Sequence, residues 1–183
     1  KKKNMNKITI NGKTFVPRIS KQEIEQKVWQ LAKQISNDYA DKNPLFLVIL
    51  NGAFIFAADL FRYISVPSEV SFTRFSSYSG TNTTGEVKQL MSISNEVKGR
   101  HVIVVEDIVD TGVSMSEILP QLERLGAKSI ELAVLLSKPE RREREVNIKY
   151  LGFEIPNEFV LGYGLDYDEK GRNLPEIYAL ETL

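Results

Sequence analysis

The chain of 183 residues contains no cysteine. This absence excludes disulfides, thiolate metal sites and a cysteine nucleophile, and it fits a reducing compartment. The sequence also has no run of about 18 apolar residues. Its basic start, residues 1–6, is not followed by the apolar segment of a signal peptide. We therefore expect a cytoplasmic protein that neither enters nor crosses a membrane.

The chain also has no net charge, because 24 basic side chains balance 24 acidic ones. A protein that binds nucleic acid non-specifically needs a broad positive field, so we expect no nucleic-acid partner and only local anion binding. The single histidine, His101, opens an apolar segment and is interpreted as an ordinary residue at the start of a strand. We therefore expect any proton transfer to fall to a carboxylate or a lysine.

The order of the predicted elements indicates the fold class. A capping box at residues 20–23 precedes apolar residues at helical spacing, and short apolar runs bounded by turn residues indicate buried strands. Residues 76–96 are rich in Ser, Thr, Gly and Asn and are interpreted as a long loop with weak strand character. A loop of this length is usually either disordered or functional, and an active-site lid is the common functional case. The predicted helices are 20–39, 53–63 and 114–125, and the predicted strands are 45–50, 69–75, 102–105, 130–136, 150–153 and 159–162.

Two strands joined through a helix, at residues 102–136, form a βαβ unit. The sequence therefore predicts an α/β fold with a mainly parallel, twisted sheet flanked by helices. It contains no internal repeat, and we expect a single domain over 1–183. Its core would span about 40–150, and a small hood would come from the N-terminal segment and residues 151–183.

The most informative segment is residues 102–114, VIVVEDIVDTGVS. A predicted strand ends in Glu106 and Asp107, and ligands of open α/β sheets bind at the carboxyl ends of strands. The turn through Thr111 and Gly112 then leads into a helix, whose first N–H groups and nearby hydroxyls can hold a phosphate. Two carboxylates beside such a turn suit a sugar phosphate with its hydroxyls and magnesium. The alternative interpretation is purely structural: a helix cap and turn, preceded by two solvated carboxylates.

The whole segment resembles the signature of type I phosphoribosyltransferases, which bind phosphoribosyl pyrophosphate (PRPP). From Leu45 to Arg172 the chain is most similar to the hypoxanthine-guanine phosphoribosyltransferases. Four further segments carry this resemblance: residues 50–53 resemble the pyrophosphate loop, Ser77-Tyr78 the lid motif, residues 136–138 the base-reading lysine, and residues 153–160 with 165–167 the base pocket.

The resemblance implies purine salvage: magnesium-dependent transfer of the 5-phosphoribosyl group from PRPP to hypoxanthine or guanine, giving IMP or GMP and pyrophosphate. It also implies a role for each matched position. Glu106 and Asp107 would hold the ribose hydroxyls and Mg²⁺, and Asp110 would act on purine N7 as the catalytic base. The 5-phosphate would lie in the turn formed by Asp110, Thr111, Gly112, Val113 and Ser114.

At the other substrate sites, the resemblance assigns the base pocket and the pyrophosphate contacts. Lys138 would donate to the purine 6-oxo group, Phe159 would stack on the base and the Val160 backbone would bond its edge. Asp166 would help to hold a second Mg²⁺. Asn51, Gly52 and Arg172 would contact pyrophosphate, and a lid bearing Ser77 and Tyr78 would exclude water.

Some of these positions have simpler interpretations when each is considered alone. Phe159 and Val160 look like core strand residues, Lys138 like a solvated strand end and Arg172 like a surface charge. Asn51 stands where the family often has lysine, although the backbone of Gly52 can still approach an anion.

Two alternative functions stay open: a PRPP-sensing regulator without catalysis, and an enzyme for another base such as xanthine or adenine. The family likeness also implies a homodimer or homotetramer.

Overall fold

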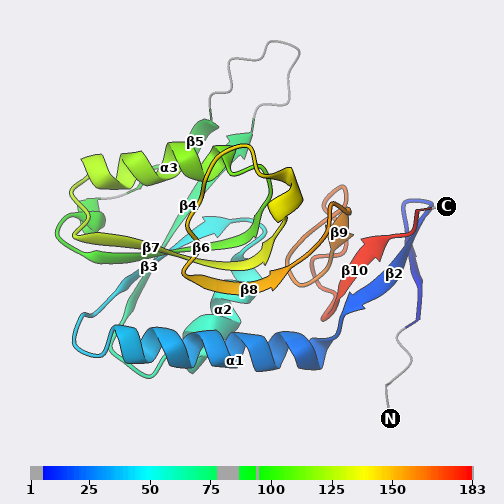
Figure 1. The fold of residues 1–183 in the computed structure, drawn as a ribbon, viewed down its shortest axis with the longest axis horizontal. Coiled ribbons are helices and arrows are strands. Elements are labelled where there is room, and N and C mark those ends of the chain that lie inside the picture. Colours follow the sequence, from blue (N-terminus) through cyan, green and yellow to red (C-terminus); the bar gives the residue numbers. More distant parts are fainter. Residues whose placement is uncertain (1–5, 78–86, 94, 183) are drawn as a thin grey trace.

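The computed structural model describes residues 6–77, 87–93 and 95–182, which form two sheets and three α-helices (Figure 1). The larger sheet has six strands in the order β5-β4-β3-β6-β7-β8. Neighbouring strands run parallel except β5, which is antiparallel to β4. The strands are β3 Leu45–Leu50, β4 Glu69–Ser77, β5 Val87–Met91, β6 His101–Val109, β7 Ser129–Ser137 and β8 Tyr150–Glu154. The mainly parallel α/β fold predicted from the sequence is thus confirmed.

Helices cover both faces of this sheet (Figure 1). On one face lie α1 (Lys21–Asp38) and α2 (Phe54–Tyr63), and α3 (Val113–Arg124) lies on the other. The continuous apolar run of β3 serves both faces, because Phe46 and Val48 pack with α1 and α2 while Leu47 packs with α3. The capping box that predicted α1 is present, with the Ser20 hydroxyl accepting from the Glu23 N–H. All three helices begin and end within about one residue of their predicted bounds.

A smaller antiparallel sheet, here called the terminal sheet, joins the two ends of the chain at one side of the main sheet (Figure 1). Its order is β1-β2-β10-β9, with β1 Ile8–Ile10, β2 Lys13–Ile19, β10 Ile177–Leu180 and β9 Val160–Leu161. Of these strands only β9 was predicted. β1 and β2 form a hairpin through Asn11-Gly12, a local turn signal that the sequence analysis missed. β10 pairs with β2 from the other end of the chain, so its pairing has no local pattern.

Two predicted boundaries were wrong. β6 continues to Val109 instead of ending at Val105, so Glu106 and Asp107 lie inside the strand and not after it. The extension follows from pairing, because Ile108 and Val109 remain in register with Leu136 and Ser137 of β7. Residues 76–96 were predicted as a long loop with weak strand character. In the described part of this range, Ser77 ends β4, and β5 is a strand that pairs with β4. A short 3₁₀ helix, Asn95–Val97, also lies in this region.

Tyr78 lies outside the described residues, so the lid stays a prediction.

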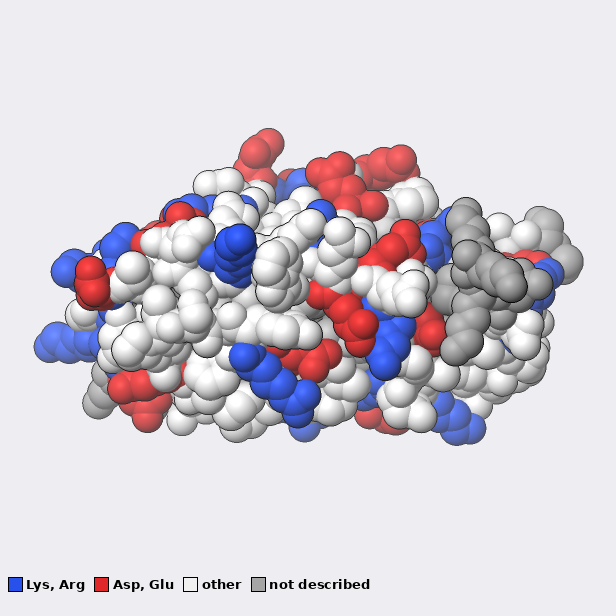
Figure 2. Space-filling view, turned by 90° about the horizontal axis from the view of Figure 1, so that it is seen from below, with Lys and Arg blue, Asp and Glu red and all other residues white. Residues whose placement is uncertain are grey.

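Among the residues that the structure does describe, no helix is both long and apolar enough to cross a bilayer. Figure 2 shows the face that carries α1 and α2, where acidic and basic side chains are interspersed with uncharged surface. On the described part of this face, neither sign of charge forms one continuous patch.

Candidate active site

The signature segment surrounds a cavity of about 140 Å³ where β6 ends and α3 begins. Six of its nine lining residues are predicted site residues: Glu106, Asp107, Asp110, Thr111, Gly112 and Ser114. Ile108, Val109 and Met115 complete the lining. The structure thus brings the acidic pair, the predicted base and the turn residues to one place. This place is the carboxyl end of a central parallel strand, where an α/β sheet binds its ligands.

The acidic pair is crowded against the backbone of its own strand. Glu106 Oε1 accepts from the Asp107 N–H at 3.0 Å, and Asp107 Oδ1 accepts from the Ile108 N–H at 2.8 Å. Burial, and next the charge of Asp107, raise the pKa of Glu106 well above its ordinary value. A cation or hydroxyl donors placed beside the pair would relieve this cost.

Glu106→Gln is expected to stabilise the free protein at high pH. A raised pKa means that the folded state holds this proton more tightly than the unfolded chain. The contribution of Glu106 to the free energy of unfolding is therefore greatest below pH 4.5, the ordinary pKa, and declines as the pH rises above it. Glutamine cannot ionise, so we expect the free energy of unfolding to exceed that of the parent by about 1 kcal/mol at pH 8 and to match it at pH 4.5.

Urea unfolding at the two pH values, without PRPP or magnesium, measures this difference. Glu145→Gln, at an exposed position, is the control and should follow the parent at both. An equal gain from Glu106→Gln at pH 4.5 and pH 8 would contradict the expected titration.

The turn after β6 has the geometry of an anion site. Gly112 has φ of 84° and is the N-cap of α3, and as glycine it has no side chain to bond the N–H groups of the first turn. The N–H groups that follow Val113 therefore face outward with the positive end of the helix dipole. The Thr111 hydroxyl lies beside them and accepts from the Val113 N–H at 3.3 Å, so its own hydrogen can donate to an anion.

A second segment, residues 138–146, clamps this turn from the side and was not predicted. The Lys138 N–H donates to the Val109 carbonyl at 3.0 Å, and the Glu143 and Arg144 N–H groups donate to the Thr111 carbonyl at 2.9 and 3.0 Å. A Cβ at position 112 would lie 2.4 Å from the Arg144 carbonyl oxygen. In sequence this segment is a run of charged residues after a proline, which is typical of a solvated loop.

Lys138 lies beside Asp110 and is only 7% exposed, so its interpretation as a solvated strand end was wrong. Its Nζ lies 3.9 Å from Asp110 Oδ2. Lys138 directly follows β7, whose last residue, Ser137, pairs with both β6 and β8, so the backbone of Lys138 lies at the centre of the sheet's carboxyl end. The pair offers a donor and an acceptor side by side at the edge of the cavity.

The predicted pyrophosphate loop reaches the same site. A Cβ at Gly52 would lie 1.8 Å from Asp107 Oδ2, so only glycine allows the loop to approach the carboxylate this closely. Asn51 precedes it, joined to Leu50 by a cis peptide bond, and its carbonyl accepts from the Phe54 N–H at 3.2 Å. The loop in turn contacts Gly164, where a Cβ would lie 2.3 Å from the Gly52 carbonyl oxygen.

Arg172 and Asp166 form an ion pair on the far side of that contact. Arg172 Nη2 lies 3.2 Å from Asp166 Oδ1, and Nη1 donates to the Gly164 carbonyl at 2.8 Å. The other oxygen of Asp166 accepts from the Glu169 N–H at 2.8 Å. Arg172 is therefore more than a solvated surface charge, since it holds the turn that packs on the pyrophosphate loop.

Phe159 and Val160 differ from each other in burial. Val160 is buried and pairs with Ala179, as expected of a core strand residue. Phe159 is 45% exposed, which contradicts its interpretation as a core residue, and its ring centroid lies 5.6 Å from that of Tyr167. The Ile155 N–H donates to the Ser137 carbonyl at 2.9 Å, which ties this segment to the end of β7 beside Lys138.

The donor set can be tested for a magnesium ion. Within the described residues, no group of three or more metal-ligating side chains forms a cage. Mg²⁺ is usually held by one or two carboxylates together with substrate phosphates, and Glu106 and Asp107 beside the turn fit that arrangement. Both oxygens of Asp166 already have protein partners, so Asp166 fits less well than the acidic pair.

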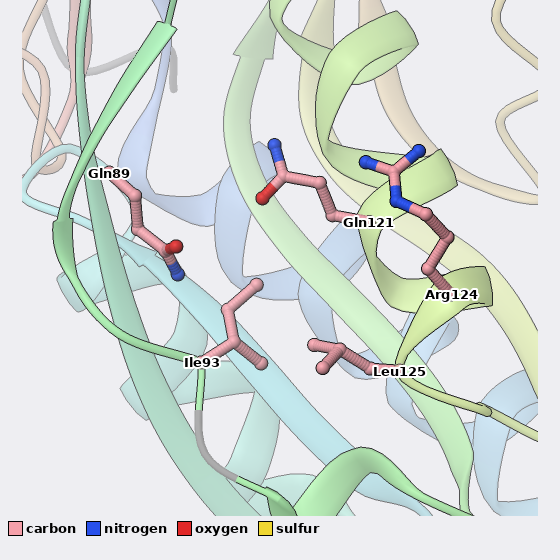
Figure 3. A pocket seen from close by; sticks show the side chains of 5 residues that line it. All are labelled: Gln89, Ile93, Gln121, Arg124 and Leu125. Atoms are coloured by element: carbon pink, nitrogen blue, oxygen red, sulfur yellow. The ribbon is translucent and has the colours of Figure 1, made fainter.

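Other hollows lie away from the signature. One of about 340 Å³ separates the end of β5 from α3 and is lined by Gln89, Ile93, Gln121, Arg124 and Leu125 (Figure 3). Another, of about 580 Å³, includes His101 at the start of β6. The His101 ring Nδ1 lies 2.6 Å from the Ser129 hydroxyl, and burial lowers the pKa of His101. His101 thus lies at the opposite end of β6 from Asp110.

Comparison with known proteins identifies the family. Residues 18–168 match the phosphoribosyl transferase domain. The chain is 41% identical over 163 residues to the hypoxanthine-guanine phosphoribosyltransferase of Streptococcus thermophilus, which covers 88% of this chain and 91% of that protein. It is 42% identical over 164 residues to the bifunctional protein TilS/HprT of Listeria monocytogenes, where the match spans 89% of this chain but only 25% of the longer protein.

Solved structures agree. A crystal structure of a hypoxanthine-guanine phosphoribosyltransferase from Bacillus anthracis has a TM-score of 0.86 and 40% identity to this chain, and the match covers 90% of this chain and 98% of that one. Both the sequence and the fold match over nearly the same share of the chain. The chain therefore belongs to the hypoxanthine-guanine phosphoribosyltransferase family.

Proposed function

We propose that this protein transfers the 5-phosphoribosyl group of PRPP to hypoxanthine or guanine, forming IMP or GMP and pyrophosphate in purine salvage. The observation that carries this proposal is the pairing of Lys138 and Asp110, 3.9 Å apart, at the edge of a cavity lined by two carboxylates and a phosphate-binding turn. We also propose the cytoplasm as its compartment, consistent with a chain without cysteine.

The sugar phosphate would occupy the cavity. The 5-phosphate accepts hydrogen bonds from the N–H groups at the start of α3 and from the Thr111 and Ser114 hydroxyls. The ribose hydroxyls donate to Glu106 and Asp107, and Gly52 brings backbone polar groups of the pyrophosphate loop to the Asp107 carboxylate. Bound Mg²⁺ would neutralise the charge of the departing pyrophosphate.

Base recognition would use Asp110 and the buried Lys138 beside it. The Lys138 ammonium donates to a 6-oxo group, and Asp110 accepts the proton at purine N7. The 6-amino group of adenine is itself a donor and cannot pair with an ammonium, so the site discriminates against adenine. Phe159, exposed next to Tyr167, offers an aromatic face on which the base can stack.

The reaction would be a displacement at ribose C1. Pyrophosphate departs as the purine nitrogen attacks an oxocarbenium-like carbon, and the protein acts mainly by positioning and electrostatics. Water attacking the same carbon would waste PRPP, so the lid that bears Ser77 and Tyr78 would close over the site.

Release of pyrophosphate from PRPP and magnesium, with hypoxanthine, guanine, xanthine and adenine in separate reactions, tests the function. We expect release with the first two bases and none with adenine. Release with adenine alone would overturn the base pocket, and release with xanthine would add that base to the substrates. No turnover with any base, together with PRPP binding, would favour the regulatory alternative.

We further propose a homodimer or homotetramer in which a second copy covers an apolar surface at the sheet edge. Val70 and Phe72 of β4 are 41% and 45% exposed. Their in-register neighbours Phe46 and Val48 lie under α1 and α2, so these helices stop short of β4.

Light scattering tests this surface. Phe72→Glu should lower the mass in solution to that of the 20.8 kDa chain, because a buried carboxylate without a partner opposes association. Trp29→Glu, at a similarly exposed aromatic residue on α1, should keep the parent's mass. A parent protein of 20.8 kDa in solution would refute the proposal.

A further inference from the structure

Asp110 has a second cationic neighbour that the sequence did not indicate. Arg141 Nε lies 3.0 Å from Asp110 Oδ1, whereas Lys138 faces the other oxygen, Oδ2. The carboxylate thus lies between two cations, one for each oxygen. Lys138 is nearly buried at the base site, and Arg141 is exposed outside it.

The backbone around Arg141 is fixed. Arg141 ends the 3₁₀ helix Pro139–Arg141, and its N–H donates to the Lys138 carbonyl at 3.1 Å. The next residue, Arg142, donates from Nη2 to the Ser137 hydroxyl at 2.7 Å. Arg141 is therefore presented to Asp110 by the clamp segment that also carries Lys138.

Asp110 Oδ1 depends on this neighbour. The atom is buried and accepts no hydrogen bond within the described part of the chain. A buried carboxylate oxygen without a donor is costly, so the Arg141 charge is the compensation that the fold provides. Without it, rotating the carboxylate to expose Oδ1 would relieve the cost and would also turn Oδ2 away from Lys138.

We propose that Arg141 is a positioning residue: it holds Asp110 Oδ1 so that Oδ2 faces the purine beside Lys138. Arg141 acts through Asp110 and does not contact the substrate. The inference rests on the proposed role of Asp110 in base activation. It adds a residue from outside the signature to the machinery of transfer.

A double-mutant cycle tests the coupling. Arg141→Ala should lower kcat with hypoxanthine about 10-fold and change the KM for PRPP less than about twofold, since the phosphate turn is held by backbone hydrogen bonds. Arg141→Lys should recover part of kcat, because it keeps the charge. In an Asp110→Asn background, Arg141→Ala should change kcat less than about twofold.

The control is Arg62→Ala, which breaks an exposed ion pair with Asp59 on α2 and should leave kcat unchanged. If Arg141→Ala kept the parent's kcat while Asp110→Asn lost activity, the role of Arg141 would be wrong and the role of Asp110 would stand. An equal loss from Arg141→Ala in both backgrounds, or no recovery with lysine, would also overturn the role of Arg141. Full activity of Asp110→Asn would instead remove the proposed role of Asp110.

Discussion

Lys138→Met is expected to lower kcat/KM for hypoxanthine about 100-fold while leaving PRPP binding nearly intact. Methionine fills similar space but has no donor, so the 6-oxo group would be buried without a partner. It also removes the cation 3.9 Å from Asp110 Oδ2, which weakens the placement of the base-activating carboxylate. Both losses concern the purine and not the phosphate turn, so the effect should appear with the base as the varied substrate.

Steady-state kinetics with each substrate varied in turn measure this split. Lys149→Met is the matched control, because Lys149 is a surface lysine with ion-pair partners at 3.9 Å on Asp38 and Glu131. It should keep the parent's kcat/KM for both substrates. A loss in Lys138→Met that appears equally in PRPP affinity would mean that Lys138 supports the whole site and does not read the base.

The sequence predicted the central sheet well because its strands are buried on both faces. The continuous apolar runs of β3 and β7 have few other interpretations, and the turn at Thr111-Gly112 is a local signal. The far end of β6 was missed because Glu106 and Asp107 interrupt the apolar run. Pairing with β7 carries the strand past the two acids, and pairing is not visible in a local pattern.

Contacts between distant segments account for most of the other misses. The clamp segment is charged and looks solvated, yet its N–H groups satisfy the Thr111 carbonyl, and Arg141 lies against Asp110. The β2 and β10 pairing likewise joins the two ends of the chain. The acidic pair and the phosphate turn were predicted from local sequence, whereas the roles of Lys138 and Phe159 came from the family resemblance, because spacing alone could not assign a buried Lys138 or an exposed Phe159.

Gly112→Ala tests the phosphate turn, and we expect it to raise the KM for PRPP at least about 10-fold and to lower stability. The φ of 84° disfavours any residue with a Cβ, by about 1–2 kcal/mol. The added methyl would also lie 2.4 Å from the Arg144 carbonyl oxygen and 2.9 Å from Val146 Cγ2. The clamp segment or the turn must therefore move, and the N–H groups that face the 5-phosphate would move with it.

Gly99→Ala separates the backbone cost from the loss of the site. Gly99 has φ of 72°, but a Cβ there would meet nothing within 4 Å. This variant should lose similar stability through its backbone while keeping the parent's KM for PRPP. Thermal unfolding and kinetics on both variants give the comparison. A clash at position 112 must displace the N–H groups of the turn and so weaken the binding of a phosphate held there. If Gly112→Ala were destabilised like Gly99→Ala but kept the parent's KM for PRPP, the 5-phosphate would therefore have to lie elsewhere.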